Sequence, residues 1–289
     1  MDTQAEEEFL KLLVRGRRPS VLYHYTTGDG LLGILKDRGI WATDIRYLND
    51  ASEYKYALEI VSNAISDRKA KARSKFSFGL LDVLEQRIAS ETQTEVFVSS
   101  FSERSDQLSQ WRAYCSPHGG YAIGIESRKL VPLSEVQGRW LVRCQYERFA
   151  QETLANDLID LVIQSAEYED ATGLVDRIYR EGYKLFGRLV HLLAPSLKDP
   201  SFAEEQEWRL VWLPDTTQDS PMFRVSRSIL VPYHLHPLAL NDAKLPIPAV
   251  VVGPTQHAHL AVEAIKTLLG SYRLHSTKVE ASKVPYRTW

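Results

Sequence analysis

The chain has 289 residues, of which 44% are hydrophobic and 25% charged, a composition typical of a globular protein with a sizeable core. Lys and Arg number 35 against 37 Asp and Glu, and the resulting net charge of −2 excludes a global positive field that would recruit nucleic acid or an anionic membrane. The two cysteines, Cys115 and Cys144, are too few for a disulfide framework. Because neither a signal-peptide pattern nor a run of transmembrane length is found, we expect a soluble, cytoplasmic protein without a membrane partner.

The N-terminal part of the chain predicts short helices and strands. Apolar positions behind a Glu triplet indicate a helix over residues 5–14, with acids in its first turn. The run VLYHYTT (21–27) is rich in β-forming residues and predicts a strand. Residues 30–39 place leucines on one helical face and end at a glycine, and residues 40–43 predict a second short strand.

The next segment predicts a pair of helices. Asp50 and Glu53 match a capping box, which begins a helix within residues 47–66. The basic residues 66–75 indicate a solvated turn, and a further helix is expected over about 79–91.

The rest of the chain is rich in predicted strands around one helical block. The block covers about residues 150–193 and contains two amphipathic stretches. We expect strands over 95–103, 121–126, 140–146, 207–212, 223–231, 247–253 and 277–281, and helices over 105–114 and 257–269.

This order of elements predicts a single α+β domain over residues 1–289, with mixed or antiparallel sheets and the helical block as an insertion. The strands do not alternate strictly with helices. The sequence also contains neither G-x-G-x-x-G after its first strand nor a Walker loop, so a doubly wound nucleotide-binding fold is not indicated.

Polar residues lie inside two of the predicted strands. His24 lies among tyrosine and threonine hydroxyls, and it is either a structural histidine or a hydrogen-bond donor to a sugar hydroxyl. Ser99, Ser100 and Ser102 place hydroxyls on both faces of a mostly apolar strand, where backbone bonding explains them as well as a ligand does. No serine lies in G-x-S-x-G, so a hydrolase nucleophile elbow is not indicated.

Three acids, Glu204, Glu205 and Glu207, stand directly before or at the start of an apolar strand. Because residues i and i+2 of a strand point to the same side, Glu205 and Glu207 would repel unless a pKa is raised or a cation meets them. Arg209, on the same face, is expected to offset the cost of burying a carboxylate. The acids are therefore either a solvated edge or a pair of carboxylates held at a site.

An aromatic pair and two glycines lie in the middle of the chain. Trp111 and Tyr114 are three residues apart on a predicted helix, a spacing that favours packing of one helical face on a sheet. Gly119 and Gly120 precede Tyr121 and permit a tight turn or a close approach of the backbone to a ligand.

The C-terminal part contains two H-x-H pairs, His234 with His236 and His257 with His259. They lack a companion cluster of acids or cysteines, so we predict no metal site. His236 precedes Pro237 in an expected loop, and the second pair falls near a helix start.

Taken in order, several motifs resemble one known family: LYHYTT, IWATD, YLND-x-x-E, SFSE, QWRAY followed by GGYAIGIE, EEQEWRLVW and KVPYR. From Leu22 to Arg287 the chain resembles the bacterial family catalogued as domain of unknown function 2971. That family name implies no established activity.

The order of a strand histidine, a serine-bearing strand and a Glu-x-Glu before a late strand is also similar to the ADP-ribosyltransferase superfamily. There, the first-strand His or Arg holds the ribose or phosphate of NAD, the middle strand braces the nicotinamide pocket and the last Glu contacts the nicotinamide ribose. The resemblance implies an ADP-ribosyltransferase-like core, with Glu207 in the last role and Glu205 where the acceptor nucleophile is often oriented. The NAD-binding residues that it implies are His24, Tyr25, Ser100, Ser102 and Tyr121.

The chain departs from the superfamily pattern in having SSFS in place of Ser-Thr-Ser, and a long insertion. Two hypotheses follow. The first is an enzyme with NAD as its substrate, an ADP-ribosyltransferase or NAD glycohydrolase acting as a toxin or phage-defence effector. The second is a non-catalytic module that binds a nucleotide-like ligand or a protein through Trp111, Tyr114 and Tyr121. The macromolecular or small-molecule acceptor and the oligomeric state are left open.

Overall fold

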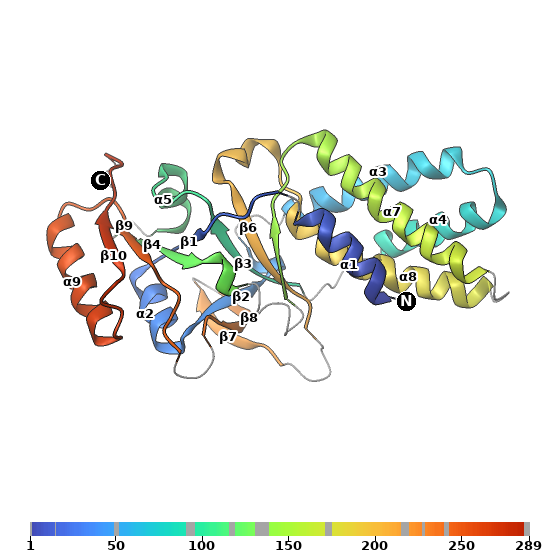
Figure 1. Cartoon of the computed structure of the whole chain (residues 1–289). Coiled ribbons are helices and arrows are strands. Elements are labelled where there is room, and N and C mark those ends of the chain that lie inside the picture. The colour runs from blue at the N-terminus through green and yellow to red at the C-terminus, as the bar shows by residue number, and fades with distance from the viewer. Residues whose placement is uncertain are drawn as a thin grey trace. The chain divides into compact units, whose positions relative to one another are not determined.

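A computed structural model of the chain (Figure 1) is mixed α+β, with one open mixed sheet and helices. The chain divides into two compact units. We call Met1–Gly16, Asp44–Val96 and Val142–Ala203 the helical unit, and Arg17–Thr43, Phe97–Leu141 and Glu204–Trp289 the sheet unit. The α+β class is confirmed, whereas a single domain over the whole chain stays a prediction. The residues described are 2–14, 16–48, 52–90, 96–115, 119–130, 139–170, 175–214, 220–226, 229–239 and 243–285.

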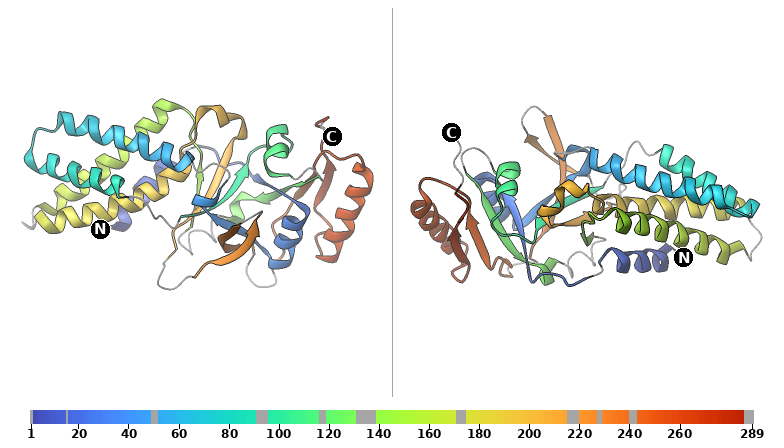
Figure 2. Two further views of the ribbon diagram at one scale, coloured as in Figure 1. Left: turned by 180° about the vertical axis from the view of Figure 1, so that it is seen from behind. Right: turned by 90° about the horizontal axis from the view of Figure 1, so that it is seen from above.

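The helical unit is built from long helices that lie alongside one another (Figure 2). Glu53 lies in the first turn of the third helix, while its predicted capping partner Asp50, like Asn49, lies outside the described residues. Its elements are α1 (Asp2–Leu13), η1 (Ile45–Tyr47), α3 (Ser52–Lys71), α4 (Lys75–Ala89), α7 (Arg148–Asp170), α8 (Val175–Leu193), η2 (Ala194–Ser196) and most of η3 (Pro200–Glu205).

The basic segment 66–75 was predicted as a solvated turn, and this prediction is wrong for most of its length. Helix α3 continues through residue 71, and α4 begins at residue 75. The reason is an ion-pair cluster between the two helices, because Lys69 Nζ lies 2.7 Å from Asp82 Oδ1 and 2.6 Å from Glu85 Oε2. Paired across an interface, these cations extend the helix instead of ending it.

Lys198 in the helical unit is a buried cation whose ion pair with Glu53 can be tested by mutation. Its side chain is only 2% exposed, and its Nζ lies 3.2 Å from Glu53 Oε1. We expect Glu53→Leu to lower the free energy of unfolding by about 3–5 kcal/mol, because it strips a buried cation of a partner. The double variant Glu53→Leu/Lys198→Met should lose less than the single one in urea denaturation. Equal or greater loss in the double variant would contradict the coupling.

The sheet unit holds the ten strands β1 (Val21–Thr26), β2 (Gly39–Asp44), β3 (Phe97–Ser102), β4 (Tyr121–Glu126), β5 (Arg139–Arg143), β6 (Glu207–Trp212), β7 (Met222–Ser226), β8 (Ile229–Pro237), β9 (Ala249–Val252) and β10 (Lys278–Ala281). The strand order is β10-β9-β4-β1-β3-β2-β8-β7, with β6 paired to both β3 and β5. The β9 and β10 pair is parallel, and β1 is antiparallel to β4 and β3. The helices of this unit are α2 (Gly28–Asp37), α5 (Leu108–Tyr114) and α9 (Ala258–Ser271).

Strand register places a set of buried apolar side chains on one face of the sheet. Phe101 pairs with Trp208, and Ile123 pairs with Val250, all within one buried cluster that also receives residues of α2 and α9. Because side chains alternate along a strand, the neighbours of these residues are turned to the opposite face. Throughout the part of the chain that the structure describes, no helix is both long and apolar enough to cross a membrane.

Two predictions for the segment around β7 and β8 are wrong. Residues 223–231 were expected as one strand, but Ser226 pairs with Ile229, so the chain reverses between them into an antiparallel hairpin. His236 was expected in a loop, but it lies in β8 opposite Ile40 of β2. Pro237 lies at the last position of that strand, where a missing amide hydrogen is tolerated.

Burial of His236 predicts a loss of stability in acid. Neither ring nitrogen of this fully buried side chain finds a hydrogen-bond partner among the described residues. Burial, and then the charge of Arg139, lower its pKa from 6.5 to about 3. Below pH 6.5 the His236 ring is therefore protonated in the unfolded chain but stays neutral in the folded chain. The free energy of unfolding falls as the pH falls from 6.5 toward 3. The loss should approach about 1.4 kcal/mol per pH unit.

The measurement is the free energy of unfolding in urea at pH 7 and at pH 4.5. His236→Leu should show a shallower fall over this interval than the wild type. An identical fall in both proteins would contradict the assignment to His236.

Candidate functional site

The site lies where two neighbouring strands of the sheet unit part. Strand β1 pairs with β4 along its whole length, from Val21 opposite Glu126 to Thr26 opposite Tyr121. With β3 it shares the pair Tyr23 and Ser102 alone in the described register. Beyond that pair, the His24 ring forms a hydrogen bond with the Ser100 carbonyl, whose oxygen lies 2.9 Å from Nδ1. The parting of the strands opens a pocket.

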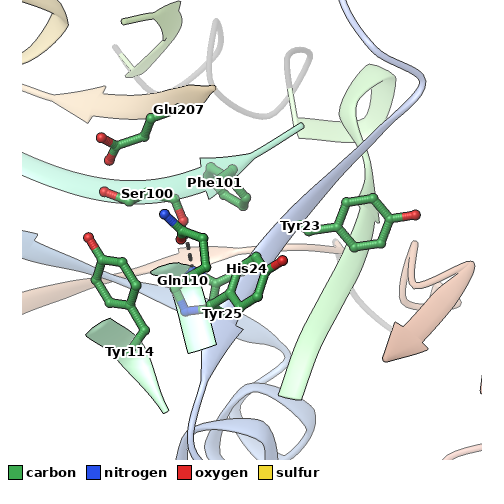
Figure 3. A pocket seen from close by; sticks show the side chains of 8 residues that line it. All are labelled: Tyr23, His24, Tyr25, Ser100, Phe101, Gln110, Tyr114 and Glu207. Carbon is green, nitrogen blue, oxygen red and sulfur yellow. Dashed lines mark hydrogen bonds between the residues drawn. The ribbon is translucent and has the colours of Figure 1, made fainter. Parts of the chain in front are cut away.

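The pocket (Figure 3) contains four of the predicted site residues, together with Tyr114, which was expected as a contact of the non-catalytic module. The empty space between its walls is about 290 Å³, part of which is open solvent. The polar ends of Glu207, Ser100, Gln110 and Tyr114 are turned toward it, whereas the Tyr23 hydroxyl points away. The lining residues are Tyr23, His24, Tyr25, Ser100, Phe101, Gln110, Tyr114 and Glu207.

The hydrogen bond of His24 to Ser100 leaves Nε2 of the ring as an acceptor, whereas the ligand contact predicted for His24 was that of a donor. A carbonyl oxygen only accepts, so the bond to Ser100 fixes the proton on Nδ1. Burial lowers the pKa of His24 below its usual 6.5 and keeps the ring neutral, despite the opposing effect of that hydrogen bond. The Nε2 atom of the neutral ring then carries a lone pair suited to a ligand hydroxyl.

Glu207 is buried, with 4% of its surface exposed, and is held by Arg209 on the same face of β6. Arg209 Nε donates to Oε1 at 2.9 Å, and an Arg209 Nη donates to Oε2 at 3.0 Å. The two-point bond stabilises the carboxylate charge and fixes the plane of the group. The predicted cation is thus found, and the predicted solvated edge does not apply to Glu207.

Glu205 and Glu207 do not share one face of a strand. Glu205 ends η3, strand β6 begins at Glu207, and Gln206 between them has a φ of 44°. A left-handed residue reverses the local direction of the backbone, so the alternation rule does not extend across it. Glu205 is buried but lies outside the pocket lining.

Ser102 also lies outside the pocket lining, where it braces the loop before β6. Its Oγ donates to the Glu205 carbonyl at 2.6 Å and accepts from the Arg104 amide at 3.0 Å. Strand register then sets Ser102 directly opposite Glu207. Of the two serines expected at the site, Ser100 lines the pocket and Ser102 positions the chain that carries Glu207.

Helix α5 supplies Gln110, which sequence reasoning missed, and Tyr114, which was expected only as a contact of the non-catalytic module. The two residues are four positions apart and share the face that lines the pocket, a spacing that could have revealed Gln110. Trp111 packs edge-on against Tyr25 at 4.7 Å between ring centres and donates to Asp106 Oδ1 at 2.8 Å. The predicted packing of this helix on the sheet is confirmed. Trp111 is only 2% exposed and, unlike its neighbour Gln110, does not line the pocket.

Tyr121 and the glycines before it are also placed away from the pocket lining. Tyr121 packs against the buried cluster of the sheet. A Cβ on Gly120 would lie 2.1 Å from Cys115 Sγ, so the close approach that this glycine permits is to the protein itself. Burial raises the pKa of the Cys115 thiol to about 12, which leaves it protonated and a poor nucleophile at neutral pH.

The histidine pairs provide no metal centre among the residues described. His257 precedes α9 and His259 lies in its first turn, as expected. Within the described ranges no group of three or more His, Cys, Asp or Glu side chains is arranged to hold a metal ion. The absence of a metal from the protein stays a prediction.

One comparison with known proteins supports the resemblance seen in the motifs. A family model described as "Protein of unknown function (DUF2971)" matches residues 110–210. The match runs from α5 into β6 and contains Gln110 and Glu207, whereas His24 and Ser100 lie outside it. No curated protein and no solved structure matches the chain.

The two serines of β3 give a matched test of the site. We expect Ser102→Ala to lower the free energy of unfolding by about 1–3 kcal/mol, because it leaves buried backbone groups without a partner. Ser100→Ala should change it by less than about 0.5 kcal/mol, since the Ser100 hydroxyl makes no hydrogen bond within the described part of the chain. Urea denaturation of both variants measures the difference, and equal effects would contradict the assignment.

Proposed function

We propose that the protein consumes NAD, as an ADP-ribosyltransferase or an NAD glycohydrolase, with an ADP-ribosyltransferase-like core in its sheet unit. The observation that supports this most is the presence of His24, Ser100 and Glu207 around one pocket. These residues come from the first, middle and late strands in the order that the resemblance implies. A role as a toxin or phage-defence effector belongs to the same proposal.

The chemistry suits these side chains. The bond between the nicotinamide nitrogen and the ribose C1′ breaks, its electron pair leaves with nicotinamide, and positive charge develops on the ribose. Glu207, fixed in a partly dry site, stabilises that charge better than a carboxylate in water would. Water or an acceptor nucleophile then bonds to C1′ and loses a proton to solvent, and His24 Nε2 accepts from a ribose hydroxyl.

The alternative is a non-catalytic module that binds a nucleotide-like ligand in the same pocket. It is favoured by the engagement of both Glu207 oxygens with Arg209, because an ion pair reduces the charge available to a reacting ribose. With Trp111 buried, the aromatic contacts left to this module are Tyr23, Tyr25 and Tyr114. Ligand binding without turnover would favour the module.

Glu207→Gln should separate the two functions. We expect it to lower nicotinamide release from NAD by about 100- to 1,000-fold, because it removes the charge that stabilises the transition state. The assay is chromatography of nicotinamide after incubation of the full chain with NAD, with water or with protein and nucleic-acid acceptors.

The matched control is Glu204→Gln, which makes the same chemical change at an exposed position three residues before Glu207, where β6 begins. It should keep the wild-type rate. Thermal unfolding of both variants shows whether the loss of the bond to Arg209 has unfolded the chain. Equal activity of wild type and Glu207→Gln, or no release by wild type with any acceptor, would refute the enzymatic proposal.

A further inference from the structure

Gln110 is a buried polar side chain in the pocket, and the proposed reaction gives it no role. It is 6% exposed, lies on α5 and lines the pocket together with Ser100 and Glu207. Among the described residues no hydrogen bond involves its amide group, and neither amide atom is fully enclosed by protein. Figure 3 shows the amide end turned toward the space beside Ser100. The amide therefore offers both a donor and an acceptor to a molecule bound in the pocket.

The helix around Gln110 is fixed, so its amide is held in place before a ligand arrives. The neighbouring Trp111 is packed on Tyr25 and bonded to Asp106. Asp106 also accepts from the Lys283 amide at 2.7 Å, which ties the C-terminal segment to the start of α5. An immobile polar group loses little entropy on binding and therefore discriminates between ligands well.

Resting on the proposed function, we propose that Gln110 is the specificity-determining residue for the carboxamide of the nicotinamide ring. A primary amide has a carbonyl acceptor and two N–H donors, so two such groups form a pair of complementary hydrogen bonds. Because part of the pocket is open to solvent, the rest of a dinucleotide would extend outside it. An acetyl group of the same size offers no N–H and would leave the Gln110 carbonyl unpaired.

The test compares nicotinamide with 3-acetylpyridine, which is also neutral, so that the charge of Glu207 does not bias the result. Binding of each compound to the full chain is measured by ligand-observed NMR titration. We expect the wild type to bind nicotinamide about tenfold or more tightly, because 3-acetylpyridine leaves the Gln110 carbonyl without a hydrogen-bond donor. Gln110→Leu should bring the ratio close to one, and Gln110→Met gives a second apolar side chain of similar length.

The matched control is Arg112→Gln, which changes an exposed residue on the same helix and should leave the preference unchanged. A wild type without the preference, or a preference that survives in a folded Gln110 variant, overturns the assignment. We would also measure kcat/KM for NAD and for its 3-acetylpyridine analogue. These values distinguish a failure of the Gln110 assignment from a failure of the proposed function. Turnover with a ratio insensitive to Gln110 refutes the role of Gln110 alone. Preferential binding without any turnover refutes the enzyme alone.

Discussion

The parting of β1 from β3 is the constraint on which the site of the sheet unit depends. The two strands share the pair Tyr23 and Ser102, after which β1 follows β4 and β3 follows β6. A backbone carbonyl released from a sheet must find another partner, and the His24 ring takes that place for Ser100. The same separation makes room for the α5 side chains and leaves the Glu207 carboxylate beside the gap.

The sheet unit accommodates its buried ionisable side chains in two ways, by pairing them or by keeping them neutral. Glu207 and Arg209 compensate one another within β6, so a carboxylate can stay beside the pocket without the full cost of an isolated buried charge. His24 and His236 are kept neutral by burial instead. The consequences differ. A neutral His24 presents a lone pair to the pocket, whereas burial of His236 lowers the free energy of unfolding in acid.

Much of the local structure follows from the residues themselves. Runs of β-forming residues predicted the strands β1, β3, β4 and β6, and the parity of Glu207 and Arg209 predicted that Arg209 would offset the charge of Glu207. The rule failed at Gln206, whose left-handed backbone is rare outside glycine and has no signal in the sequence. It also failed at residues 66–75, where acids of a neighbouring helix determine whether a basic segment stays helical.

The sequence by itself determined the α+β class, the order of the polar motifs and which side chains of a strand share a face, because these properties depend on neighbours a few positions away. The tertiary structure decided which of those side chains meet. Ser100 and Ser102 have the same parity, yet Ser102 is bonded to the Glu205 backbone and Ser100 faces the pocket. Gln110 likewise joins the site through the packing of α5 on β1. Strand separation and helix docking depend on residues far apart in the chain, which local spacing does not encode.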